Sequence, residues 1–309
     1  MTAPLLTSDK VLVDFATEVG ESGAIAIEGS RTRWNRGGAL TEGTRIVNAP
    51  TDVVDFQPDE MIVTVRAGTT VADLEAALAE RGQRSALPDR GGTVGGALAV
   101  GENHLDVLGR GLLRASLLEV RYVSAEGKLV RGGGPTVKNV TGFDIPRIMV
   151  GSLGTLGCIA EVILRTNPIP AQSQWCEAHG VNPFDVRDAI LRPSAILWNG
   201  TTTSVLLEGH SVDVADQLRT LNRMGKFSEV ESAPQLPLYR WSLTPADLRN
   251  VTRYDTGPFV ASVGVGIVFA EKPQPPREVS VAVRNVSERL KANFDPTGRL
   301  NPGRCAWEL

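Results

Sequence analysis

The order of apolar and polar positions in the first half of the chain predicts alternating helices and strands. We expect a helix over 8–20, followed by an apolar strand at Ala24–Glu28. Short strands are expected near 45–48 and at Met61–Arg66, where β-branched side chains are frequent. This alternation favours an α/β domain.

The segment Thr70–Glu80 predicts a further helix. Leu74 and Leu78 share one face of it. Thr70 is a suitable N-cap, and Gly82 is placed to end the helix.

A hairpin is expected next, because strands at 118–124 and 128–131 flank the turn Ala125–Gly127. With it, the α/β domain is predicted to occupy 1–170.

From about residue 172 a different order begins, and we predict a second domain over 171–277. The order β-α-β-β-α-β is typical of ferredoxin-like domains. The expected strands are 173–179, 194–199, 203–208 and 226–231, and the expected helices are 183–191 and 211–224.

The last part of the chain has a weaker pattern. The segment 232–257 is rich in proline and polar residues and predicts a loop. Phe259–Ala270 predicts one more strand, and 278–292 predicts a helix. We expect 278–309 to be a helix and tail that return to the first domain.

Composition narrows the function. The 309 residues have a formal net charge of −3, which disfavours a nucleic-acid-binding protein. Three cysteines and three histidines, all dispersed, predict neither a disulfide framework nor a metal site. No stretch approaches the roughly 20 apolar residues of a membrane-spanning helix, and no secretory signal is visible at the amino end. We expect a cytoplasmic protein.

Three glycine-rich segments are candidates for a ligand-binding site: Gly29–Arg33, Gly91–Gly96 and Gly151–Gly157. None matches the P-loop or the Rossmann fingerprint. Consecutive backbone N–H groups in such turns can bind anions, and arginine adds charge-assisted bonds to phosphate. Each segment alone is more often a plain turn. Three in one α/β domain favour a large cofactor that contains phosphate.

These segments, together with Lys138–Arg147 and the tail Phe294–Arg304, resemble the vanillyl-alcohol-oxidase, or PCMH-type, FAD-binding family. The resemblance covers about 20–167 and 291–305. It implies an α+β fold with a PCMH-type FAD-binding domain of two α/β subdomains and a ferredoxin-like cap domain. Lys138–Arg147 is particularly similar to the E-type flavin subunits of bacterial glycolate oxidases.

The resemblance also implies cofactor-binding residues. The first pyrophosphate loop would be Gly29, Ser30, Arg31, Thr32 and Arg33. The second loop, beside the diphosphate and the isoalloxazine ring, would be Thr93, Val94, Gly95 and Gly96. Gly111 matches a glycine at the end of that region, Ile159 a position at the adenine end, and Asn301 a tail asparagine near the flavin ring.

The first loop lacks the histidine that covalent relatives often carry, so we expect FAD to be bound non-covalently. Glu28 is expected to point away, because its charge would oppose phosphate.

The catalytic residues cannot be named from the sequence. His179 and His210 are far apart and are more often packing residues than bases. Lys138 and Asn139 could contact substrate or flavin, or could simply order their loop. Asp144 and Arg147 fit a local ion pair better than acid–base catalysis.

Two classes of function therefore stay open. The chain could be the FAD-binding subunit of a glycolate (2-hydroxy-acid) oxidase or dehydrogenase, with a catalytic FAD subunit and an iron–sulfur subunit as partners and peripheral membrane contact through that complex. It could instead be a non-catalytic scaffold with a flavin fold. A stand-alone FAD-dependent oxidase of a small hydroxy acid or alcohol is a third possibility.

Overall fold

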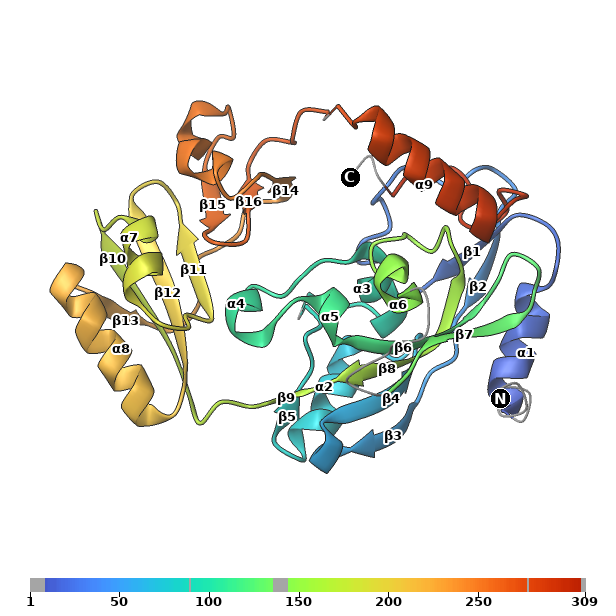
Figure 1. Cartoon of the computed structure of the whole chain (residues 1–309), viewed down its shortest axis with the longest axis horizontal. Helices are drawn as coiled ribbons and strands as arrows, with labels where there is room; N and C mark the ends of the chain where they lie inside the picture. Colours follow the sequence, from blue (N-terminus) through green and yellow to red (C-terminus); the bar gives the residue numbers. More distant parts are fainter. Residues whose placement is uncertain (1–8, 89, 136–143, 277, 307–309) are drawn as a thin grey trace. The chain divides into compact units, whose positions relative to one another are not determined.

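The computed structural model describes residues 9–88, 90–135, 144–276 and 278–306, which divide into two compact units (Figure 1). The first unit comprises Met1–His104, Leu112–Pro168 and Arg277–Leu309, and the second comprises Leu105–Gly111 and Ile169–Pro276. The first unit thus takes its residues from both ends of the chain.

A five-stranded antiparallel sheet is the centre of the first unit (Figure 1). Seven of the eight residues of its middle strand are buried, because the sheet is covered on both faces. The strand order is β3 (Val53–Gln57), β4 (Ile62–Arg66), β8 (Cys158–Arg165), β6 (Leu117–Val123) and β7 (Leu129–Gly133).

Two small sheets complete the strands of this unit. β1 (Ile25–Glu28) pairs in parallel with β2 (Arg45–Asn48). β5 (Gln83–Arg84) pairs antiparallel with β9 (Asn167–Pro168). The predicted strands and the hairpin of β6 and β7 are confirmed, whereas β3, β5 and β9 were not predicted.

Most helices of the first unit bury residues against this core, whereas the helix over 281–294 has no buried residue. α2 (Val71–Ala79) begins at Thr70, whose hydroxyl accepts the Asp73 N–H as predicted. The others are α1 (Lys10–Val19), α3 (Val94–Val100), α5 (Leu113–Ser116), α6 (Ile145–Met149) and α9 (Val281–Phe294), besides the short 3-10 helix η1 (Pro58–Glu60).

Opposite charges are buried between neighbouring strands of the large sheet. Glu161 of β8 is fully buried and pairs with Arg121 of β6 and with Arg66 of β4, the latter at 2.8 Å. Arg66 also binds Asp9, the N-cap of α1, at 2.7 Å. The network therefore connects three strands to the first helix.

The second unit is a seven-stranded antiparallel sheet with α7 (Pro183–Ala189) and α8 (Ser211–Met224). Its first four strands follow the ferredoxin-like order β13 (Ser228–Val230), β10 (Gln172–His179), β12 (Thr202–Gly209) and β11 (Ala195–Trp198). This confirms the predicted arrangement of the cap.

Two predictions for the end of this unit were wrong. Phe259–Ala270 is a hairpin of β15 (Phe259–Ser262) and β16 (Ile267–Ala270), because Gly264 and Gly266 at positive φ turn the chain. The segment predicted as loop contains β14 (Tyr239–Ser242), which pairs with β16, and the 3-10 helix η2 (Asp247–Arg253).

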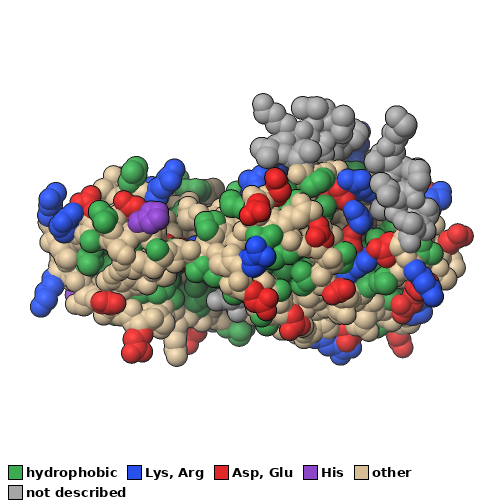
Figure 2. Space-filling view, turned by 90° about the horizontal axis from the view of Figure 1, so that it is seen from below, with side chains coloured by type: hydrophobic (Ala, Val, Ile, Leu, Met, Phe, Trp, Pro, Cys, Tyr) green, Lys and Arg blue, Asp and Glu red, His purple; other side chains and the backbone are tan. Residues whose placement is uncertain are grey.

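The short helix α4 (Val107–Arg110) clusters with the second unit, although the sequence assigned it to the first domain. None of the described helices is long and apolar enough to cross a membrane. On the face drawn in Figure 2, acidic and basic side chains are interspersed.

The carboxyl-terminal tail is anchored in the first unit by one buried arginine. Arg299 is 5% exposed, and its guanidinium group donates five hydrogen bonds of 2.8–3.1 Å to backbone carbonyl oxygens. Four of these oxygens belong to Val19–Gly23 at the end of α1, and the fifth belongs to Ala125. Leu300 then pairs with Ile25, so the tail continues the small sheet of β1 and β2.

Replacing Arg299 with methionine should lower the free energy of unfolding by about 3 kcal/mol, because five carbonyl oxygens lose their buried donor. Urea denaturation followed by circular dichroism measures this. The exposed Arg289 of α9 is the control, and Arg289→Met should change stability by less than about 0.5 kcal/mol. Equal stability of the two variants would contradict the anchoring role.

The three thiols should differ in reactivity. Burial raises the pKa of Cys158 and of Cys176 to about 12, whereas Cys305 is only half-buried. Since the thiolate is the reactive form, a disulfide reagent at pH 8 should modify Cys305 alone in the folded protein and all three thiols in denaturant. Rapid modification of two or three thiols in the folded protein would refute this.

Candidate functional site

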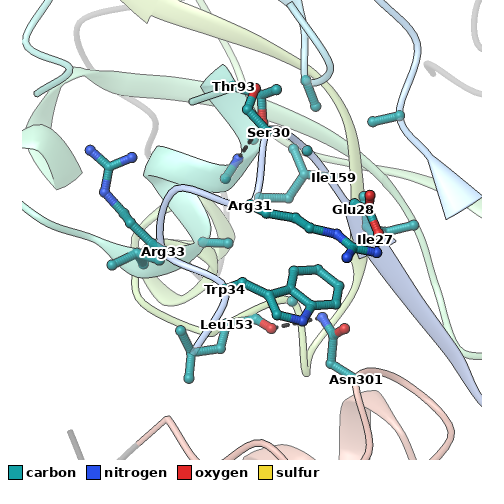
Figure 3. A pocket seen from close by; sticks show the side chains of 18 of the residues that line it. Ile27, Glu28, Ser30, Arg31, Arg33, Trp34, Thr93, Leu153, Ile159 and Asn301 are labelled. Atoms are coloured by element: carbon teal, nitrogen blue, oxygen red, sulfur yellow. Dashed lines mark hydrogen bonds and ion pairs between the residues drawn. The ribbon is translucent and has the colours of Figure 1, made fainter. Parts of the chain in front are cut away.

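A pocket opens in the first unit, where the three glycine-rich segments and the tail come together (Figure 3). Small apolar side chains make up much of its wall, with a few polar groups and three arginines among them. The lining residues used below are Glu28, Gly29, Ser30, Arg31, Thr32, Arg33, Trp34, Ala67, Thr93, Gly95, Gly96, Ala99, Leu153, Gly154, Ile159, Asn301 and Arg304.

The first loop follows β1 and forms one wall of the pocket. Arg31 has a left-handed backbone with φ 55°, which places successive N–H groups in the kind of nest that binds anions. No acceptor in the described part of the chain bonds the backbone N–H groups of Ser30, Arg31 or Thr32. These donors are available to a ligand.

The first and second loops are joined by Arg33. Its guanidinium group donates to the carbonyl oxygen of Gly91 at 2.9 Å and pairs with the buried Glu102 at 3.2 Å. In Figure 3, Arg33 extends to the side of the loop opposite Arg31 and Glu28. Arg33 therefore holds the two loops together.

The glycines of these loops are required by contacts within the protein. A Cβ on Gly29 would meet Thr93 Oγ1 at 2.5 Å, and a Cβ on Gly95 would meet the Cβ of Ala67 at 2.8 Å. The predicted loop at Thr93 is in fact the start of α3, because the Thr93 hydroxyl accepts the Gly96 N–H at 3.2 Å and caps the helix. Glycine thus lets the loops approach one another.

The third loop meets the tail at Asn301. The Asn301 side chain donates to the Leu153 carbonyl oxygen at 2.7 Å (Figure 3). Leu153 and Asn301 are left-handed, with φ 52° and 44°. With Arg31, they are three of the six non-glycine residues at positive φ in the described ranges. Such strained backbone is frequent at ligand sites.

The wall beside Arg31 differs from expectation. Glu28 lines the pocket instead of pointing away, because it pairs with Arg31 at 2.6 Å. Trp34 and Arg304 also line the pocket, and the sequence analysis missed both. An aromatic residue directly after an anion-binding loop, and an arginine in the tail motif, were the available signals.

Two predicted site residues lie elsewhere in the fold. Val94 is fully buried in the core of the first unit and does not line the pocket. Gly111 clusters with the second unit and does not line the pocket either.

Lys138 and Asn139 are outside the described residues. Asp144 and Arg147 form the predicted local ion pair, at 3.0 Å.

The pocket has the properties that a flavin nucleotide requires. Its mostly apolar wall suits a planar ring system. The free backbone N–H groups of the first loop suit a diphosphate. Among the lining residues described, Glu28 has the one carboxylate, and no histidine is present.

Comparison with known proteins agrees with this chemistry. Residues 10–133 match the family described as an FAD binding domain. This part of the chain contains the first two loops of the pocket, and the match confirms the resemblance drawn from the glycine motifs.

Among curated proteins, the glycolate oxidase subunit GlcE of Escherichia coli (strain K12) is 32% identical over 170 residues, which are 54% of this chain and 49% of that protein. The mitochondrial D-lactate dehydrogenase [cytochrome] of Arabidopsis thaliana is 26% identical over 83% of this chain and 43% of that protein. The matched region thus spans about half the length of these relatives or less.

A solved alkyldihydroxyacetonephosphate synthase superposes with a TM-score of 0.66 at 14% identity, covering 90% of this chain and 71% of that one. This likeness supports the fold.

Gly154 should be sensitive even to alanine. Its φ is +69°, and an added Cβ would collide with the Asn301 amide nitrogen. Gly82 has nearly the same φ, +66°, with no neighbour within 4 Å, and is the matched control. Both alanine variants carry backbone strain, but Gly154→Ala should cost about 1 kcal/mol more in urea unfolding because it also breaks the Asn301–Leu153 bond. Equal losses would show that the contact is unimportant.

Proposed function

We propose that this chain is the FAD-binding subunit of a multi-subunit glycolate (2-hydroxy-acid) oxidase or dehydrogenase. The main support is the pocket. Its wall is formed by the loops for which the sequence predicts FAD binding, and most of its lining residues lie within the region that matches an FAD binding domain. The similarity to a protein named as a glycolate oxidase subunit favours this substrate class.

In this proposal the first loop binds the cofactor diphosphate. The N–H groups of Ser30, Arg31 and Thr32 are already oriented by the left-handed turn, so little ordering is lost on binding. Thr93, Gly95 and Gly96 of the second loop, together with Asn301, would line the flavin. Bound FAD would supply two-electron redox chemistry.

The pocket contains little that could act as a base. Its one described carboxylate, Glu28, is engaged by Arg31 at 2.6 Å. Oxidation of a hydroxy acid requires a group that accepts the hydroxyl proton. This favours a subunit that works with others, in which a catalytic flavin subunit provides the base and an iron–sulfur subunit accepts electrons. The proposal includes a cytoplasmic location, with membrane contact only through the complex.

One observation favours a second candidate. The match to the mitochondrial D-lactate dehydrogenase covers 83% of this chain. A stand-alone FAD-dependent oxidation of a small hydroxy acid is therefore the alternative.

The cofactor is tested by filling the pocket. Ala99 lines it, and Ala99→Leu should weaken FAD binding at least tenfold because the larger side chain occupies ligand space. Ala79→Leu, on the exposed end of α2, is the control and should bind like the wild type. Fluorescence titration measures the affinities.

The flavin should be released from the denatured protein and pass through an ultrafiltration membrane, because no histidine or cysteine lines the described pocket to bind it covalently.

A purified protein that binds no FAD would contradict the proposal. Anaerobic mixing of the FAD-loaded chain with glycolate or D-lactate separates the two candidates. Bleaching of the isolated chain favours the stand-alone enzyme, and bleaching only with partner subunits favours the proposed complex.

A further inference from the structure

Arg304 differs from the other two arginines of the pocket in its partners. Arg31 pairs with Glu28 at 2.6 Å, and Arg33 pairs with Glu102 at 3.2 Å. In the described part of the chain, no carboxylate lies within ion-pair distance of Arg304. Two of the three cations are neutralised within the protein, and Arg304 is the exception.

The guanidinium group of Arg304 is also short of hydrogen bonds. One terminal nitrogen donates to the Arg36 carbonyl oxygen at 3.2 Å. Its Nε is buried and has no hydrogen-bond partner among the residues that the structure describes. By contrast, the guanidinium group of Arg299 donates hydrogen bonds to five carbonyl oxygens. Arg304 is therefore a cation with unused donors.

Arg304 is nevertheless held in place. Its guanidinium carbon lies 4.6 Å from the centre of the Trp34 ring. The backbone on either side is fixed, because Arg304 N–H donates to Asn301 at 3.2 Å and Cys305 N–H donates to Gly37 at 2.8 Å. Arg304, which lines the pocket, thus lacks the freedom of a surface arginine.

A half-buried cation without an anion is unfavourable, since burial removes water from the charge. Burial lowers the pKa of Arg304. An anionic ligand would supply both the missing charge and the missing acceptor.

The surroundings indicate which anion this is. Arg31, at the centre of the loop with free N–H groups, lies 5.1 Å from the same Trp34 ring. Both guanidinium groups therefore contact the same indole ring, that of the residue directly after the first loop. We propose that Arg304 is the cation that pairs with the diphosphate of the bound flavin nucleotide, while Trp34 holds it in position. This rests on the proposed FAD binding.

Three variants test the charge separately from the packing. Arg304→Met keeps an unbranched side chain against Trp34 but removes the charge, and Arg304→Lys keeps the charge. Arg284→Met, on the exposed part of α9, is the control. Fluorescence titration with FAD and with riboflavin, which lacks phosphate, measures affinity. Thermal melting with inorganic diphosphate provides a readout that needs no flavin and also verifies that each variant folds.

FAD affinity should fall roughly tenfold to a hundredfold in Arg304→Met, as expected for a lost charge-assisted hydrogen bond, and by less in Arg304→Lys. Riboflavin affinity should not change. Inorganic diphosphate should raise the melting temperature of the wild type and of Arg284→Met, and do so much less for Arg304→Met.

Unchanged FAD affinity in Arg304→Met would overturn the inference, as would equal weakening of FAD and riboflavin. Stabilisation of the FAD-loaded wild type, but not of Arg304→Met, by glycolate would assign Arg304 to a substrate carboxylate instead. A wild type that binds no FAD would refute the proposed function itself, which distinguishes the two failures.

Discussion

The first unit depends on a buried guanidinium group that joins its two ends. Arg299 donates to five carbonyl oxygens, four of which belong to Val19–Gly23 at the end of α1. This arrangement aligns Leu300 with Ile25 and places Asn301 and Arg304 at the pocket. The tail that lines part of the pocket is therefore also the segment that connects the two ends of the unit.

The pocket is shaped by contacts between loops rather than by any single loop. Gly29 lies against Thr93, Gly95 against Ala67, and Gly154 against Asn301. Each glycine removes a Cβ that would separate two segments distant in sequence. The left-handed Arg31, Leu153 and Asn301 are maintained by the same packing. A site built in this way exists before the ligand arrives, so a ligand loses little free energy in ordering it.

Much of the fold follows from local pattern, and the rest depends on distant contacts. Thr70 and its helix, the ferredoxin-like order and the glycine loops could be predicted because hydrophobic period, caps and turns are encoded locally. Strand β14 could not be predicted, since its segment is polar and the strand forms only by pairing with β16, which is distant in the sequence. Val94 was misplaced for a similar reason: motif position assigned it to the cofactor, whereas α3 turns its side chain into the core.

The partners of the charged residues explain why the site itself was only partly predictable. Arg31 and Arg33 have the residue type and position expected of phosphate ligands, but each is paired with a carboxylate, Glu28 and Glu102 respectively. What the first loop contributes freely is backbone N–H groups, which any residue can supply once the turn is formed. Side-chain charge must then come from outside the loop. In the proposed FAD complex, Arg304 of the tail would supply this charge, because no carboxylate of the described residues pairs with it and Arg299 fixes the segment from which it projects.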